Sequence, residues 1–290
     1  MGAARAAERA GTRLTLSTAS SYSIEEVAGG TAHDHWFQLY PWGDGGSFTD
    51  SMLDRARDAG YRTLVVTVDV PVQGNRVGER HTGMGHPPIL TPRRIADAAI
   101  RPRWWYGLLR YKRMTMRNVT EVRGTGGAVA GVAVQQRRMR PDLTWRDVAA
   151  LRDRWDGPFL VKGVLEPADA ERAVDDVGAT GVVVSNHGGR QLNAAVASLD
   201  ALPGVADAVG DRAAVLLDGG VRTGTDAVTA LALGADAVMI VRPCPYGLAV
   251  AGSAGVEAVL GILAAEIRQT LLLMGVAAVT DLGRDHLLPA

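Results

Sequence analysis

Short apolar runs alternate with amphipathic stretches along most of the chain. The apolar runs are a few residues long and rich in β-branched side chains, a pattern typical of strands buried on both faces. The predicted strands are Arg13–Ser17, His35–Tyr40, Leu64–Asp69, Phe159–Val164, Gly181–Ser185, Val215–Asp218 and Ala237–Val241.

Helical periodicity fills the intervals between most of these strands. The predicted helices are a short one opened by the capping box Ser23–Glu26, then Phe48–Ala59, Thr144–Trp155, Pro167–Val177, Leu199–Val209, Thr225–Leu233 and Tyr246–Gly275. Such alternation predicts an α/β fold with parallel strands. A closed (β/α)8 TIM barrel needs eight strands, and the chain opens on a helix-like Ala/Arg segment. We therefore expect a barrel whose first strand is missing from this chain; an open doubly wound sheet is the alternative.

One segment interrupts the alternation, from about residue 70 to residue 143. It is too long for an ordinary βα loop, so it is predicted to be an irregular lid, insertion or partner site within a single domain spanning residues 1–290. Residues 91–140 contain twelve basic and two acidic side chains, together with Trp104, Trp105 and Tyr106. An Arg-rich solvated lid is one interpretation. Peripheral contact of residues 91–140 with an anionic membrane surface is the other.

Composition narrows the class of protein. With 47% hydrophobic residues and zero net charge, the chain can build a sizeable core and lacks the basic balance of a general nucleic-acid binder. Its one cysteine, Cys244, excludes a disulfide framework and a Cys-based metal site, and no metal is predicted. The first eleven residues lack the apolar centre of a signal peptide. The most apolar long window, placed near Leu260–Val279, is broken by charges, so a cytoplasmic location is expected.

Candidate chemistry gathers where the predicted strands end. Gly181–Ser185 runs directly into Asn186, His187, two glycines and Arg190. A histidine exchanges protons near neutral pH, an arginine grips a carboxylate with two parallel hydrogen bonds, and glycines let backbone approach a ligand. A satisfied histidine beside a surface arginine is the plainer interpretation. The concentration of all three residue types at one strand end favours a site.

Two further segments suggest functional chemistry: a lysine inside an apolar strand and a possible phosphate-binding loop. Lys162, one of only two lysines, lies inside an apolar strand, where an ammonium must be paired, functional or able to reach water. Asp218–Arg222, followed one strand later by Arg242, is similar to the phosphate-binding loops after the last two strands of a barrel. A glycine-rich turn with surface arginines is the alternative.

Together these segments resemble the FMN-dependent 2-hydroxy-acid dehydrogenase/oxidase family, which includes lactate, glycolate and mandelate enzymes. The resemblance covers nearly the whole chain, and the basic insertion is similar to the lactate and mandelate dehydrogenase branch. The motifs that carry it are Trp36–Tyr40, Thr67–Asp69, Val161–Gly163, Ser185–Leu192 and Asp218–Arg222.

The resemblance implies FMN-dependent oxidation of an (S)-2-hydroxy acid, lactate- or mandelate-like, to the 2-oxo acid. His187 would be the catalytic base, Asp69 would stabilise its protonated form, and Lys162 would stabilise negative charge on the reduced flavin. Substrate contacts are implied for Tyr40, Arg76, Arg190 and His187. Flavin contacts are implied for Ser17, Gln38, Thr67, Lys162, Ser185, Asp218, Gly219, Gly220, Val221, Arg222, Val241 and Arg242.

The same resemblance implies an electron acceptor, whether oxygen, a quinone or a cytochrome, and a homotetramer. Three departures from the family pattern matter: the N-terminal part is absent, Val241 replaces a glycine, and Asn193 replaces an aspartate. They leave open a truncated, catalytically impaired relative that does not bind flavin. A weaker alternative is another phosphate-binding barrel, such as an aldolase using Lys162 as a Schiff-base amine.

Overall fold

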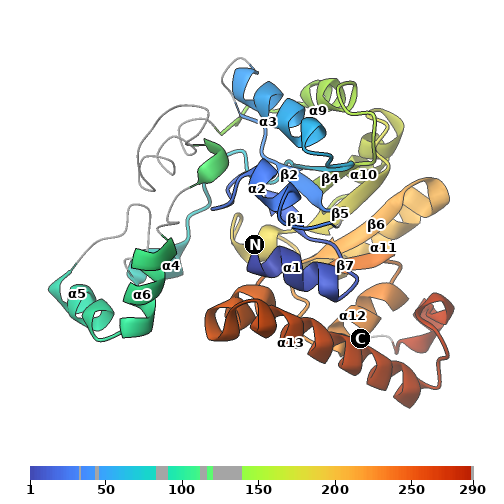
Figure 1. The fold of residues 1–290 in the computed structure, drawn as a ribbon. Coiled ribbons are helices and arrows are strands. Elements are labelled where there is room, and N and C mark those ends of the chain that lie inside the picture. Colours follow the sequence, from blue (N-terminus) through green and yellow to red (C-terminus); the bar gives the residue numbers. More distant parts are fainter. Residues whose placement is uncertain (33, 43–45, 83–90, 112–115, 120–138, 289–290) are drawn as a thin grey trace.

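The computed structural model describes residues 1–32, 34–42, 46–82, 91–111, 116–119 and 139–288 (Figure 1). In these residues seven parallel strands form one sheet in simple chain order, from β1 at one edge to β7 at the other. This order confirms the predicted βα units and contradicts a doubly wound sheet, which reverses its strand order at a switch point. The strands are β1 (Thr15–Ser17), β2 (Trp36–Leu39), β3 (Thr63–Thr67), β4 (Phe159–Val164), β5 (Gly181–Ser185), β6 (Ala214–Asp218) and β7 (Ala237–Met239).

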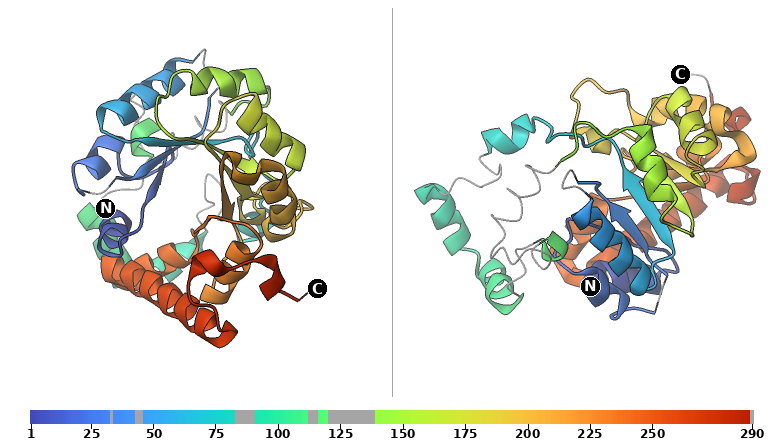
Figure 2. Two further views of the ribbon diagram at one scale, coloured as in Figure 1. Left: turned by 90° about the vertical axis from the view of Figure 1, so that its right-hand side faces the viewer. Right: turned by 90° about the horizontal axis from the view of Figure 1, so that it is seen from above.

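Helices surround the curved sheet on its outer face (Figure 2). Several begin where the sequence predicts, because Ser23, Thr144 and Thr223 each form a capping box that satisfies backbone N–H groups of the first turn. The helices are α1 (Gly2–Arg9), α2 (Ile24–Ala28), α3 (Ser47–Asp58), α9 (Trp145–Arg152), α10 (Pro167–Asp175), α11 (Ser198–Val209), α12 (Gly224–Ala232) and α13 (Pro243–Met274).

The sheet has an apolar core on each face. The larger core packs the sheet against the helices and includes Phe37, Val66, Val161 and Val182. The smaller core lies on the opposite, concave face and consists of one residue from each of four neighbouring strands, namely Val65, Leu160, Val183 and Leu216. Burial on both faces explains why the strands read as continuous apolar runs.

A layer of polar side chains lies above the smaller core, and these side chains form the base of the candidate site. Side chains two residues apart in a strand point to the same face. Two residues after each member of the smaller core, the next side chain on the concave face therefore lies nearer the C-terminal end of its strand. These residues are polar in every one of those strands, and each is at most 8% exposed: Thr67, Lys162, Ser185 and Asp218. Gln38 on β2 stands two residues beyond Trp36, which packs against the same core.

The predicted irregular segment is partly helical, which corrects the sequence analysis. It contains α4 (Val77–His81), α5 (Pro92–Ala99) and α6 (Pro102–Tyr111), and these helices project away from the sheet (Figure 1). The signals were local: the Thr91 side chain accepts a hydrogen bond from Arg94 N, and Pro92 supplies a favourable first turn. Residues 112–115 and 120–138 of the predicted membrane-contact segment lie outside the described residues.

Two further expectations need correction at the C-terminal end of the chain. Strand β7 ends at Met239, so Val241 lies beyond the strand. The described chain also contains one helix, α13, that is long and apolar enough to cross a membrane by length and composition alone. The backbone of α13 is not helical at Ala251 and Gly252, so its length is divided between two shorter helices.

Candidate active site

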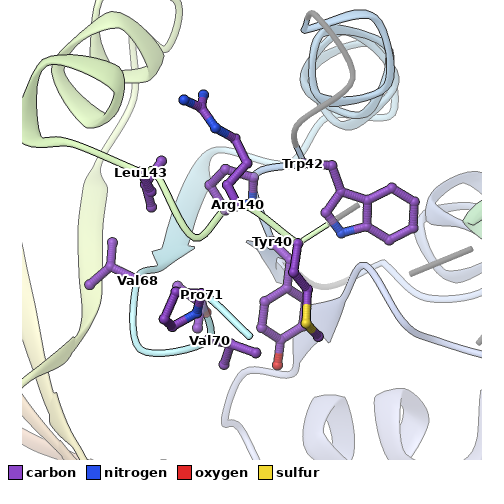
Figure 3. Close-up of a pocket in the computed structure, with 10 residues that line it drawn as sticks. Tyr40, Trp42, Val68, Val70, Pro71, Arg140 and Leu143 are labelled. Carbon is purple, nitrogen blue, oxygen red and sulfur yellow. The ribbon is translucent and has the colours of Figure 1, made fainter. Parts of the chain in front are cut away.

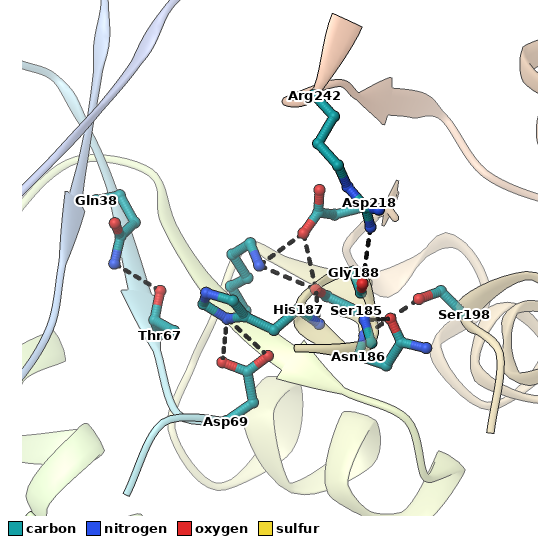
Figure 4. Close-up of polar contacts among 12 residues, drawn as sticks. Gln38, Thr67, Asp69, Ser185, Asn186, His187, Gly188, Ser198, Asp218 and Arg242 are labelled. Atoms are coloured by element: carbon teal, nitrogen blue, oxygen red, sulfur yellow. Dashed lines mark hydrogen bonds and ion pairs between the residues drawn. The ribbon is translucent and has the colours of Figure 1, made fainter. Parts of the chain in front are cut away.

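His187 and Asp69 form the centre of the site, although they come from strands that are not neighbours. His187 Nδ1 lies 3.0 Å from Asp69 Oδ1 and 3.3 Å from Asp69 Oδ2 (Figure 4). The loops that follow β3 and β5 therefore meet over the end of β4. Gly163 on β4 permits this approach, because a Cβ built there would lie 2.5 Å from the Cβ of Asp69.

The backbone at His187 is held in an unfavourable conformation. Its φ of 57° makes it the one non-glycine residue with positive φ in the described chain. Such a conformation costs free energy unless the surroundings enforce it, and it is found most often at functional sites. Two neighbours enforce it here: Ser185 Oγ accepts from His187 N at 3.0 Å, and Asn186 Oδ1 accepts from Gly189 N at 3.0 Å.

Tyr40 faces the other nitrogen of the histidine ring. Its hydroxyl lies 3.4 Å from His187 Nε2. Burial raises the pKa of the Tyr40 phenol well above its usual value and Asp69 adds to this effect, whereas the charges of Arg76 and Arg190 act in the opposite direction. The phenol is therefore protonated at neutral pH and available as a donor. Arg76 follows β3 and Arg190 follows β5, so both arginines belong to loops at the same end of the sheet.

Lys162 is the centre of a buried charged network. Its Nζ lies 2.7 Å from Asp218 Oδ2 and donates to Ser185 Oγ at 2.9 Å. Ser185 in turn donates to Asp218 Oδ2 at 2.8 Å. The Ser185 hydroxyl therefore uses its one donor and both acceptor positions, on Asp218, Lys162 and the backbone of His187. The network joins the cation in the polar layer directly to the turn that carries the histidine.

The remaining predicted flavin contacts lie around the same rim. Gln38 Nε2 donates to Thr67 Oγ1 at 2.7 Å, and Ser17 is in register with Gln38 on the adjacent strand. Arg242 Nη2 donates to the carbonyl oxygen of Gly188 at 2.7 Å, so it reaches the histidine turn (Figure 4).

The residues of the Asp218–Arg222 loop differ in whether their backbone or their side chain can reach a ligand. Gly219 and Gly220 have φ values of 98° and 83°, which favour glycine. The Val221 side chain is buried in the larger core, so only its backbone can reach a ligand. Arg222 is exposed, and its backbone N–H donates to Asp226 Oδ2. Val241 is also exposed, at 63%.

A small pocket lies beside Tyr40, under the segment that returns from the insertion (Figure 3). Met139 in this segment pairs with Trp42, which follows β2, so the end of the insertion is attached to the strand that carries Tyr40. Most of its walls are apolar. The lining residues are Tyr40, Pro41, Trp42, Thr67, Val68, Val70, Pro71, Met139, Arg140 and Leu143.

Sequence reasoning missed the residues that hold the site together without carrying chemistry. Gly163 was such a case, and its signal was a glycine inside an otherwise continuous strand, which indicates a close approach. Asn186 and Gln191 were quoted in the motif but received no role. Ser198, whose Oγ accepts from Asn186 N at 3.1 Å, had no signal in the sequence.

The comparisons with known proteins decide the family. A model of the FMN-dependent dehydrogenase family matches residues 1–289. The chain belongs to the FMN-dependent dehydrogenase family. Among its relatives, the L-lactate dehydrogenase of Pseudomonas aeruginosa is 44% identical over 287 residues, which are 98% of this chain and 74% of that protein. The L-lactate dehydrogenase of Vibrio cholerae is 42% identical over 98% of this chain and 75% of its own length.

Solved structures of family members agree. A monotopic membrane protein, (S)-mandelate dehydrogenase, matches with a TM-score of 0.93 and 38% identity, covering 100% of this chain and 76% of that one. A mandelate oxidase solved with (S)-2-phenylpropionate matches with a TM-score of 0.76 and 37% identity, over 96% of this chain and 70% of that one. This chain thus spans about three quarters of the relatives it matches.

The donor set at the rim suits the FMN on which the family depends. A flat polar ring needs donors and a cation at a buried surface, and the polar layer supplies an amide, hydroxyls and an ammonium there. A phosphate needs backbone N–H groups and guanidinium groups, and the Gly219–Gly220 turn with Arg242 offers both.

Proposed function

We propose that this protein uses FMN to oxidise an (S)-2-hydroxy acid, lactate- or mandelate-like, to the corresponding 2-oxo acid. One observation carries the proposal: the His187 ring lies between the Asp69 carboxylate and the Tyr40 phenol, and Arg76 and Arg190 follow Asp69 and His187 in the same two loops. A base, a group that stabilises its charge, and cations for a carboxylate are what this reaction requires. Relatives named as L-lactate and (S)-mandelate dehydrogenases support the substrate class.

The residues of the chain would divide the work as follows. Arg76 and Arg190 bind the substrate carboxylate and orient the α-carbon. His187 Nε2 accepts the proton that the substrate loses, because Nδ1 is engaged with Asp69. The Asp69 carboxylate stabilises the resulting imidazolium, and protonated Tyr40 donates a hydrogen bond to the bound acid. FMN, when bound, would accept the two electrons and the second proton.

FMN would be held by the polar layer and the two loops beside it. Gln38, Thr67, Lys162 and Ser185, with Ser17 at the edge, would contact the ring, and the Lys162 ammonium would balance negative charge there. Asp218–Arg222, Val241 and Arg242 would hold the ribityl-phosphate end. Lys162 Nζ is occupied by its ion pair with Asp218, an arrangement that disfavours the alternative of a Schiff-base amine.

Absorbance spectroscopy of the purified protein tests this proposal directly. We expect titration with FMN to give a yellow complex, and anaerobic addition of (S)-lactate or (S)-mandelate, but not the (R) enantiomers, to bleach it. His187→Gln should keep FMN bound and lose bleaching, whereas His286→Gln, an exposed histidine far along the chain, should bleach normally. A chain that takes up no FMN would instead favour the impaired-relative alternative.

We also propose that the α5–α6 hairpin contacts a membrane surface, where a quinone would accept the electrons. Its described residues expose Ile95 at 55%, Trp104 at 47% and Tyr106 at 68%, beside the exposed basic residues Arg93 and Arg110. Aromatic side chains suit the headgroup region, and arginines suit anionic lipids. Sedimentation with anionic vesicles should exceed that with zwitterionic vesicles, and Trp104→Ala with Tyr106→Ala should reduce it. The homotetramer and the cytoplasmic location stay predictions.

A further inference from the structure

We propose that Gln191 is a positioning residue that sets the spacing of Arg76 and Arg190, the two cations assigned to the substrate carboxylate. The inference rests on the proposed function for the identity of that carboxylate. Arg76 follows β3 and Arg190 follows β5, and β4 separates those two strands in the sheet. Hydrogen bonds within the sheet therefore do not fix the distance between the two loops at the level of the guanidinium groups.

Gln191 supplies a direct link between the two loops. Its Nε2 donates to the carbonyl oxygen of Val72 at 3.1 Å. Val72 lies four residues before Arg76, and Gln191 is adjacent to Arg190. A side chain beside one cation thus holds the backbone that leads to the other. The contact with Val72 O also fixes which end of the amide is the donor, because a carbonyl oxygen can only accept.

Gly74 shows that the two loops are in close contact at the same point. A Cβ built on Gly74 would lie 2.5 Å from the carbonyl oxygen of Arg190 and 2.7 Å from the Cα of Gln191. Both neighbours are backbone atoms, so they cannot move aside as a flexible side chain would. The glycine and the glutamine amide therefore form one contact, which we call the clasp: Gly74, Val72, Arg190 and Gln191.

The position of the Gln191 amide carries a free-energy cost, because one of its two polar ends is buried without a partner among the described residues. Its Oε1 is buried and has no hydrogen-bond partner among the described residues. A buried acceptor without a partner is unfavourable, and such groups in folded proteins call for an explanation. Retention of the donor contact with Val72 at the expense of the acceptor is consistent with a requirement for loop position. A leucine of similar length would pack without that penalty and would lose the link.

Substrate binding and chemistry should respond differently if the clasp positions the cations. Bidentate recognition of a carboxylate depends on the placement of both guanidinium groups, and small misplacements reduce rates or affinities by about 10- to 100-fold. His187 is fixed separately by Asp69, Ser185 and the Asn186 turn. We therefore expect Gln191→Leu to raise KM by about 10-fold or more while kcat falls much less.

The test uses FMN-loaded protein and two readouts. The first is the split between KM and kcat for (S)-lactate or (S)-mandelate. The second is the affinity for oxalate, a carboxylate that the enzyme cannot oxidise, measured by calorimetry. Gln191→Leu and Gly74→Ala should both weaken oxalate by about 10-fold, because each disrupts the clasp from a different loop. Gln269→Leu and Gly78→Ala are the matched controls, since Gln269 is exposed and a Cβ on Gly78 meets nothing within 4 Å.

The outcomes separate this inference from the proposed function. If the unmodified protein binds oxalate but oxidises no 2-hydroxy acid, the proposed function fails, and loss of oxalate affinity in both clasp variants still supports the clasp. If both variants fold and bind oxalate as tightly as the unmodified protein, the clasp is refuted even when oxidation is observed. A fall in kcat with KM and oxalate affinity unchanged would also overturn it.

Discussion

Exposure, rather than distance, should decide how strongly the ion pairs of this protein contribute to stability, and the pair of Lys162 and Asp218 is the sharpest test. The side chains of these residues are 11% and 8% exposed, and their charged atoms lie 2.7 Å apart. Lys162→Met keeps most of the length of the side chain but leaves the Asp218 carboxylate buried, with the Ser185 hydroxyl as its one side-chain donor among the described residues. Removal of one partner from a buried pair costs about 3–5 kcal/mol.

The double variant separates the pair from its parts. Asp218→Asn alone leaves Lys162 without a counter-ion, whereas Lys162→Met with Asp218→Asn leaves no buried charge. We therefore expect the double variant to lose less stability than the two single variants combined, with a coupling free energy of about 2–3 kcal/mol. A total stability of about 5–15 kcal/mol means that the single variants will lie close to the unfolding threshold.

Urea unfolding of the FMN-free protein measures these differences, with fluorescence and circular dichroism compared to check for a single transition. The matched control is the pair of Arg212 and Asp175, whose side chains are 45% and 49% exposed. A pair in water should couple by less than about 1 kcal/mol. If Lys162 and Asp218 couple no more strongly than this surface pair, the account of a dry, charged polar layer is wrong.

Two further predictions follow from the same structure. A hydrogen bond from Arg55 lowers the pKa of Glu25 to about 2, so the stabilising effect of this pair is present above pH 4.5 and is lost as pH falls toward 2. Because Glu25 is half exposed, Glu25→Gln should reduce the free energy of unfolding by less than about 1 kcal/mol at pH 7. The reduction should be smaller again at pH 3, and urea unfolding at the two pH values measures it. Gly163→Ala should destabilise by more than Gly178→Ala, since both have positive φ but only the first meets Asp69, and thermal unfolding of the two variants gives the comparison.

The strands were predictable because each is an apolar run, and the central ones are buried on both faces. The ends of the strands were harder to predict. Ile240 and Val241 continue the apolar pattern of β7, but the pairing of β7 with β6 ends at Met239. Helices α5 and α6 escaped prediction although their sequences are amphipathic, and α5 has no buried residue to mark a core face. The break in α13 at Gly252 was likewise invisible in an apolar sequence.

The chemistry of the site was predictable from residue types at strand ends, because parallel strands end on one rim. The supporting geometry was not. That Gly163 accommodates Asp69, and that Gly74 lies against Arg190, depends on contacts between loops whose strands are separated by a third strand. A sequence pattern records what each strand end carries, but a contact across an intervening strand depends on the curvature of the sheet and on the path of two loops.

The conformation of His187 connects these observations. Its positive φ is unfavourable for a residue with a Cβ, and Gly188 and Gly189 continue in the same region of backbone space at no such cost. A glycine or asparagine at position 187 would suit the turn better. Histidine is nevertheless placed there, its N–H bound to Ser185 and its ring to Asp69. Since Ser185 is also the partner of Lys162, the polar layer that would hold the flavin is the same structure that enforces the turn. The backbone N–H of His187 and the buried ammonium of Lys162 therefore share one hydroxyl group, that of Ser185.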